Sequence, residues 1–193
     1  MLKKANEVLK NNGVILLPTE TVFGLAVIFD SKVAFSNLME VKHRPSEKNF
    51  PIAVNSIDQI CMIADLSEYE KKVVEAILPD SITVIVKVKD EYSFLTNNGA
   101  IAVRYSKNSL IYDIIEKVGK PLLLTSANIS GEEPVKSVKE AKKVFGDKVG
   151  YYIDGRVMYN RASTIIDIRN NQIIEIRKGP ISLEEIKSKI ENI

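Results

Sequence analysis

The stretch STIIDIRNNQIIEIRKG, residues Ser163–Gly179, decides what type of sheet this chain builds. Two runs rich in β-branched residues alternate with polar residues around Asn170-Asn171. Asparagine tolerates the positive φ that a tight hairpin turn requires. An antiparallel pair of strands is therefore expected here, and the sheet should be mixed rather than purely parallel.

Upstream of this hairpin, short apolar runs alternate with helical periodicities, which is typical of an α/β protein. Predicted strands span residues 14–17, 50–54, 82–88, 101–104, 122–125 and 151–153, and predicted helices lie at the N-terminus, over 33–41, from about Asn108 to Gly119 and over 183–193. Capping boxes, in which a serine and a glutamate bond each other's free backbone amides, predict helix starts at Ser67–Glu70, Ser137–Glu140 and Ser182–Glu185. We expect a mixed sheet with helices packed on it, in a single domain over residues 1–193.

Composition narrows the function classes. With 45% hydrophobic and 27% charged residues in 193, the chain has globular proportions. Its net charge of +2 does not by itself indicate a protein that binds nucleic acid or a membrane surface. The lone Cys61 and lone His43 exclude an internal disulfide and a Cys/His zinc site. The longest apolar run, residues 22–29, is too short to span a bilayer, so a cytoplasmic protein is expected.

Four polar segments adjoin predicted strands, where α/β proteins place ligands. They are PTETVFGL (18–25), KHRPSEKNFPI (42–52), LLLTSANISGEEP (122–134) and the two hairpin ends at Ser163 and Arg177. The common phosphate-binding motifs G-x-x-x-x-G-K-[ST] and G-x-G-x-x-G are absent from the sequence. A nucleotide, if bound, must therefore be held by another arrangement.

The second segment gathers Lys42, Arg44 and Lys48 within seven residues. Arginine grips phosphate oxygens with two parallel hydrogen bonds and lysine adds a mobile point charge, so this spacing suits a polyphosphate or several separate anions. The alternative is a solvated charged loop, and His43 within it is predicted to be merely exposed.

The other segments offer hydroxyl and amide groups. At strand ends, Ser126 and Asn128 could orient a ligand by hydrogen bonds, as could the threonines of segment 18–25. Alternatively, these side chains bond their own backbone and shape turns. Ser163 and Arg177 could approach one another across the hairpin ladder.

Taken together and in this order, PTETVFGL, KHRP, SAN (126–128), STIID (163–167) and Arg177-Lys178-Gly179 resemble the motifs of the YrdC-like family of L-threonylcarbamoyladenylate synthases, in its short TsaC type. The resemblance implies a twisted mixed α/β sheet with flanking helices around a positively charged cavity, of the YrdC/RibB-like kind, without an additional C-terminal domain. It implies an enzyme that joins L-threonine, bicarbonate and ATP into threonylcarbamoyl-AMP with release of pyrophosphate. That product supplies N6-threonylcarbamoyladenosine in tRNA.

The resemblance also implies roles for individual residues. The catalytic residues would be Lys42 and Arg44. The ATP-binding residues would be Arg44, Lys48, Asn128 and Arg177, and the threonine-binding residues would be Thr21, Arg104, Ser126 and Ser163. Mg²⁺ is expected to accompany ATP, with no protein ligand assigned, because this ion typically keeps several waters.

Two other functions compete with this one. An RNA-binding or ribosome-maturation module could use the same basic cavity, since double-stranded RNA is recognised through phosphates and shape. A carbamoyl-transfer domain like that of the hydrogenase-maturation relative is a closer alternative, but one cysteine cannot supply the zinc-finger region that usually accompanies it. Contact with tRNA or double-stranded RNA, and transfer of the product to downstream t6A transferase proteins, are further expectations that the sequence leaves open.

Overall fold

The computed structural model describes residues 1–43, 49–105, 107, 109–157 and 162–191. In these ranges one sheet has the strand order β7-β1-β2-β6-β3-β5-β4-β8-β9. The strands are β1 (Ile15–Pro18), β2 (Phe23–Ile28), β3 (Ile52–Val54), β4 (Ile82–Lys87), β5 (Ala100–Tyr105), β6 (Leu122–Ser126), β7 (Tyr151–Tyr152), β8 (Thr164–Asp167) and β9 (Ile174–Arg177). Three neighbouring pairs, β1 with β7, β3 with β5 and β4 with β8, are parallel and the others are antiparallel. The predicted mixed sheet is confirmed.

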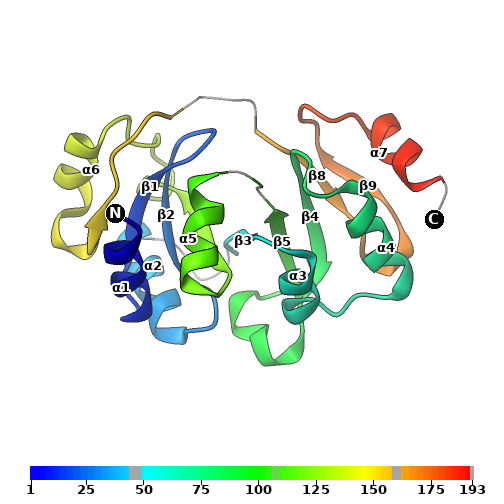
Figure 1. Cartoon of the computed structure of the whole chain (residues 1–193), viewed down its shortest axis with the longest axis horizontal. Coiled ribbons are helices and arrows are strands. Elements are labelled where there is room, and N and C mark those ends of the chain that lie inside the picture. Colours follow the sequence, from blue (N-terminus) through cyan, green and yellow to red (C-terminus); the bar gives the residue numbers. More distant parts are fainter. Residues whose placement is uncertain (44–48, 106, 108, 158–161, 192–193) are drawn as a thin grey trace.

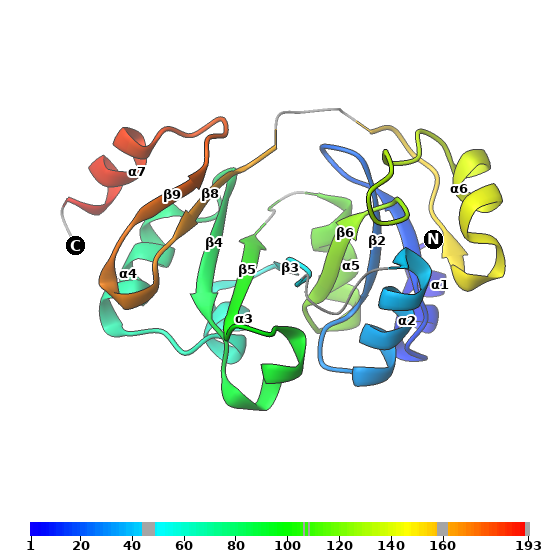
Figure 2. The ribbon, with the colours of Figure 1, turned by 180° about the vertical axis from the view of Figure 1, so that it is seen from behind.

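Helices flank this sheet. They are α1 (Leu2–Lys10), α2 (Lys32–Lys42), α3 (Ile57–Ile63), α4 (Glu68–Ile77), α5 (Leu110–Val118), α6 (Val138–Phe145) and α7 (Leu183–Ile190), with short 3-10 turns η1 (Asp90–Leu95), η2 (Gly146–Lys148) and η3 (Arg169–Asn171). Helices α1 and α5 pack side by side, whereas α2 packs on β2 from the opposite face (Figures 1 and 2). Apolar side chains between helices and sheet form the core. Within the described ranges, none of the helices combines the length and apolar character that crossing a membrane requires.

Two of the three predicted capping boxes are complete, at Ser67 and Ser182. For the third capping box, predicted at Ser137–Glu140, only one of the two hydrogen bonds forms. The Ser137 hydroxyl accepts from the backbone amide of Glu140, but the Glu140 carboxylate accepts from the amide of Lys136 instead of that of Ser137. Helix α6 is therefore capped by the serine alone.

The predicted hairpin is confirmed as the antiparallel pair β8 and β9, and both Asn170 and Asn171 have positive φ, of 60° and 57°. Its connection, residues 168–173, contains η3 and is longer than the tight turn expected. Strand β2 and helix α3 were not predicted. Every residue of β2 is buried, so its sequence lacks the alternation that marks a strand with one wet face.

Candidate active site

The described residues line a cavity of about 680 Å³, to whose wall the strands β1 to β6, β8 and β9 all contribute. Part of its wall is a row of cross-strand neighbours. Along β3, β5, β4, β8 and β9 the paired residues are Ala53, Arg104, Thr83, Ile165 and Arg177. Paired residues of adjacent strands point to the same face of a sheet, and all five of these line the cavity. The strand register therefore brings two arginines and a threonine hydroxyl to one surface.

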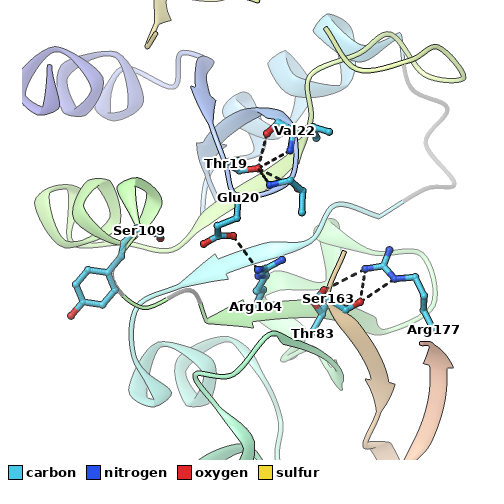
Figure 3. A network of polar contacts seen from close by, with 10 residues as sticks. Thr19, Glu20, Val22, Thr83, Arg104, Ser109, Ser163 and Arg177 are labelled. Carbon is cyan, nitrogen blue, oxygen red and sulfur yellow. Dashed lines mark hydrogen bonds and ion pairs between the residues drawn. The ribbon is translucent and has the colours of Figure 1, made fainter. Parts of the chain in front are cut away.

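Arg104 is held from across the cavity by the loop that joins β1 to β2. Its Nη2 donates to Oε2 of Glu20 at 3.0 Å, and both side chains keep some exposure, 25% for Arg104 and 32% for Glu20 (Figure 3). The guanidinium is thus oriented by one carboxylate while it still faces the open volume. A carboxylate of a small ligand could form the charge-assisted bonds that arginine favours.

The loop itself is shaped by Thr19. The Thr19 hydroxyl donates to the Val22 carbonyl at 2.6 Å and accepts from the backbone amides of Thr21 and Val22, each at 3.2 Å (Figure 3). The Thr19 hydroxyl thus shapes the local turn, as the alternative interpretation predicted, and it also lies 3.3 Å from the Thr21 hydroxyl. This turn presents the neighbouring Glu20 and Thr21 to the cavity.

A second polar cluster joins β4, β8 and β9. The hydroxyls of Thr83 and Ser163 lie 2.8 Å apart, with Ser163 only 3% exposed. Arg177 donates through Nε and Nη2 to the Ser163 carbonyl, at 3.1 and 2.8 Å, and through Nη2 to the Ser163 hydroxyl at 3.3 Å (Figure 3). The predicted approach of Ser163 and Arg177 across the ladder is confirmed.

The Gly179 that follows Arg177 lies against the backbone of β8. A Cβ there would come within 2.1 Å of the Thr164 nitrogen. Only glycine permits this approach, and it brings the end of β9 close to Ser163.

The end of β6 is organised by a buried cation. Lys42, the last residue of α2, is 1% exposed. Its Nζ donates to the carbonyls of Ser126 and Asn128, at 2.6 and 2.9 Å, and to Oδ1 of Asn128 at 3.1 Å. The same Oδ1 accepts from the Ser126 hydroxyl at 2.6 Å. The ammonium therefore fixes the amide that orients this hydroxyl.

The remaining bonds of Asn128 shape the turn after β6. Its Nδ2 donates to the carbonyls of Ile129 and Glu132, both at 2.8 Å. The Ser126 hydroxyl donates its hydrogen bond to Asn128, so its oxygen lone pairs can accept a hydrogen bond from a ligand.

The structure brings together five of the predicted site residues: Thr21, Arg104, Ser126, Ser163 and Arg177 all line the cavity. Lys42 and Asn128 are not among the described lining residues, and Lys42 instead donates to the carbonyls of Ser126 and Asn128. The predicted Arg44 and Lys48 lie outside the described residues. His43, which ends α2 with a left-handed backbone, is exposed as predicted.

Sequence reasoning assigned no role to several polar residues of the wall, among them Glu20, Thr83, Ser109 and Arg156. Glu20 lies inside the motif PTETVFGL, but the sequence did not reveal that it pairs with Arg104. Ser109 accepts from the Tyr112 amide as the cap of α5. Among the described residues that line the cavity, the charged side chains are three arginines and one glutamate. In the same ranges, no cluster of three or more His, Cys, Asp or Glu side chains could hold a metal ion.

Comparison with known proteins shows the family of this chain. A model of the Sua5/YciO/YrdC family, described as telomere recombination, matches residues 7–179. The chain belongs to the Sua5/YciO/YrdC family, as its motifs predicted.

Its relatives include named synthases. The threonylcarbamoyl-AMP synthase of Aliivibrio fischeri is 37% identical over 164 residues, which cover 81% of this chain and 89% of that protein. The threonylcarbamoyl-AMP synthase of Pseudoalteromonas translucida is 34% identical over 166 residues, covering 83% and 89%. The structure of P. abyssi Sua5 complexed with L-threonine superposes with a TM-score of 0.83 at 25% identity, over 100% of this chain and 58% of that one.

Proposed function

We propose that this protein synthesises L-threonylcarbamoyl-AMP from L-threonine, bicarbonate and ATP and releases pyrophosphate. The observation that carries the proposal is the joint placement of Arg104, Thr21, Ser126 and Ser163 around one cavity. It stands beside relatives named for this synthesis and a solved relative that holds L-threonine.

The threonine end of the cavity follows from the chemistry of the amino acid. Its carboxylate suits Arg104, whose guanidinium Glu20 already orients. Its hydroxyl needs small hydrogen-bonding partners, which Thr21, Ser126 and Ser163 provide without adding charge. We assign these groups to L-threonine.

The reaction needs no nucleophile from the protein. The amine of L-threonine and bicarbonate first combine to N-carboxythreonine with loss of water, and a carboxylate oxygen of this carbamate then attacks the α-phosphorus of ATP. The bond from that phosphorus to the bridging oxygen breaks, and pyrophosphate leaves with the electron pair. Catalysis then consists of positioning and of cations placed where negative charge accumulates. Asn128 and Arg177 are the described residues assigned to the nucleotide, and the predicted contribution of Arg44 and Lys48 to the phosphates belongs to the same proposal.

Mg²⁺ is proposed to arrive with ATP as part of the substrate. The described wall carries one carboxylate, that of Glu20, and this carboxylate is paired with Arg104. Such a wall suits an ion that is held by phosphate oxygens and waters. Lys42 is assigned a positioning role: its hydrogen bonds hold the end of β6, which presents Ser126 to the cavity.

The RNA-binding module is not favoured, because relatives named as synthases match more than four fifths of the chain. Use of the product for N6-threonylcarbamoyladenosine in tRNA, and its transfer to t6A transferase proteins in the cytoplasm, complete the proposal.

The test measures pyrophosphate release by the purified protein while ATP, L-threonine or bicarbonate is omitted in turn. Release should require all three. Release that is independent of L-threonine would contradict the proposal, and tRNA binding with a steep salt dependence but no turnover would favour the RNA-binding module.

A further inference from the structure

Arg156 is a cavity-lining cation to which neither the motifs nor the proposed function assigns a role. It follows β7, its side chain is exposed, and it belongs to the cavity wall. Within the described ranges it makes no hydrogen bond or ion pair, whereas the two other arginines of the wall contact Glu20 and Ser163. Its guanidinium therefore keeps its donors available for an anion.

The backbone on both sides of Arg156 is anchored. The amide of Ile153 donates to the Leu16 carbonyl at 2.8 Å, and Val157 is 7% exposed. At Gly155, a Cβ would come within 2.8 Å of Cγ of Pro18, the last residue of β1. Arg156 is therefore fixed beside the strand end from which the loop of Glu20 and Thr21 begins.

Arg156 and Arg177 approach the cavity from opposite edges of the sheet. Strand β7, which precedes Arg156, forms one edge, and β9, which ends at Arg177, forms the other (Figure 1). An extended polyanion is held well by cations that meet it from two sides. A threonine carboxylate, by contrast, is served by a single guanidinium.

The exposure of Arg156 indicates which part of the ligand it meets. The terminal phosphates of a nucleoside triphosphate carry the most charge and cost most to remove from water. They should lie where the cavity opens to solvent, which is also where pyrophosphate can depart.

We propose that Arg156 binds the β- and γ-phosphates of ATP, and the pyrophosphate that they become. This inference rests on the proposed function, since it takes ATP as the nucleotide of this cavity.

The experiment compares Arg156→Ala and Arg156→Lys with a matched control, Lys139→Ala, which removes an exposed cation of α6 outside the cavity wall. Dissociation constants for ATP, inorganic pyrophosphate, AMP and L-threonine are measured by titration calorimetry at low and at moderate salt. Arg156→Ala should weaken ATP and pyrophosphate binding about tenfold, because hydrogen bonds to charged groups are lost. AMP and L-threonine binding should stay within about twofold. Arg156→Lys should recover part of the loss, and higher salt should reduce the difference.

An equal loss for AMP and ATP, a loss for L-threonine, or unchanged pyrophosphate binding would overturn the assignment. A wild-type protein that binds neither ATP nor pyrophosphate would overturn it as well. If the wild-type protein forms threonylcarbamoyl-AMP while Arg156→Ala binds pyrophosphate normally, only this inference fails. If pyrophosphate binding depends on Arg156 but no adenylate forms, the proposed function fails instead.

Discussion

Replacing Lys42 by methionine tests whether this buried ammonium acts through the end of β6. The substitution keeps most of the length and the apolar stem but removes the three hydrogen bonds that the Lys42 ammonium donates to described residues, two of them to the carbonyls of Ser126 and Asn128. The Ser126 carbonyl still accepts from the backbone amide of Asn128 at 3.1 Å, so only the Asn128 carbonyl loses its partner. One half-buried carbonyl without a partner should cost about 1–3 kcal/mol, which corresponds to a fall in melting temperature of roughly 2–12 °C for a chain of this size.

The assay is thermal unfolding followed by circular dichroism, beside the control Lys10→Met. Lys10 is likewise the last-turn lysine of its helix, but it is exposed. The control should melt within about 1 °C of the wild-type protein, as surface substitutions usually do. If Lys42→Met also melts within about 1 °C of the wild-type protein and yet loses turnover, the ammonium acts on the substrate directly. That result would refute the reasoning from its contacts.

Three further outcomes are expected. Thr83→Val removes the hydroxyl that contacts Ser163, so the KM for L-threonine should rise about fivefold, for a bond worth about 1 kcal/mol, and an unchanged KM in steady-state kinetics would remove Thr83 from the site. Gly179→Ala places a methyl group into the backbone of β8 and should destabilise the fold by about 1–3 kcal/mol, whereas an unshifted urea midpoint would count against the close approach. The pKa of Glu185 is lowered by the hydrogen bond from the backbone amide of Ser182, so its contribution to stability is present at neutral pH and disappears as pH falls through that lowered pKa. The difference in melting temperature between wild type and Glu185→Gln should therefore shrink on acidification, and a constant difference across the titration would contradict it.

Local chemistry was enough to predict several elements of the fold. Two asparagines that tolerate positive φ marked the β8–β9 hairpin, and Ser67 and Ser182 marked helix starts. The failures arise where tertiary burial replaces a local pattern. All residues of β2 are buried, so its alternation between two faces is invisible in the sequence. The Glu140 carboxylate could accept from the backbone amide of either Lys136 or Ser137, and residue spacing alone does not decide between the two.

Cavity residues inside contiguous motifs, such as Thr21 and Ser126, could be predicted, whereas Thr83, which belongs to none of the quoted motifs, could not. Thr83 is opposite Arg104 only because β4 and β5 pair in one particular antiparallel register. The sequence predicted Lys42 as a catalytic residue, but not that its donors would be used by the carbonyls of Ser126 and Asn128. Arg156 belongs to no motif, and only the contact between Gly155 and β1 shows why it lines the cavity.

The most direct measurement of the central claim uses ATP, L-threonine and carbon-13-labelled bicarbonate with the purified protein, followed by mass spectrometry of the nucleotide products. The account predicts threonylcarbamoyl-AMP that carries the label, formed only when L-threonine is present. It also predicts a strong loss of this product with Arg104→Ala at limiting L-threonine. Absence of the labelled adenylate under conditions in which the folded protein binds both ATP and L-threonine would contradict the account.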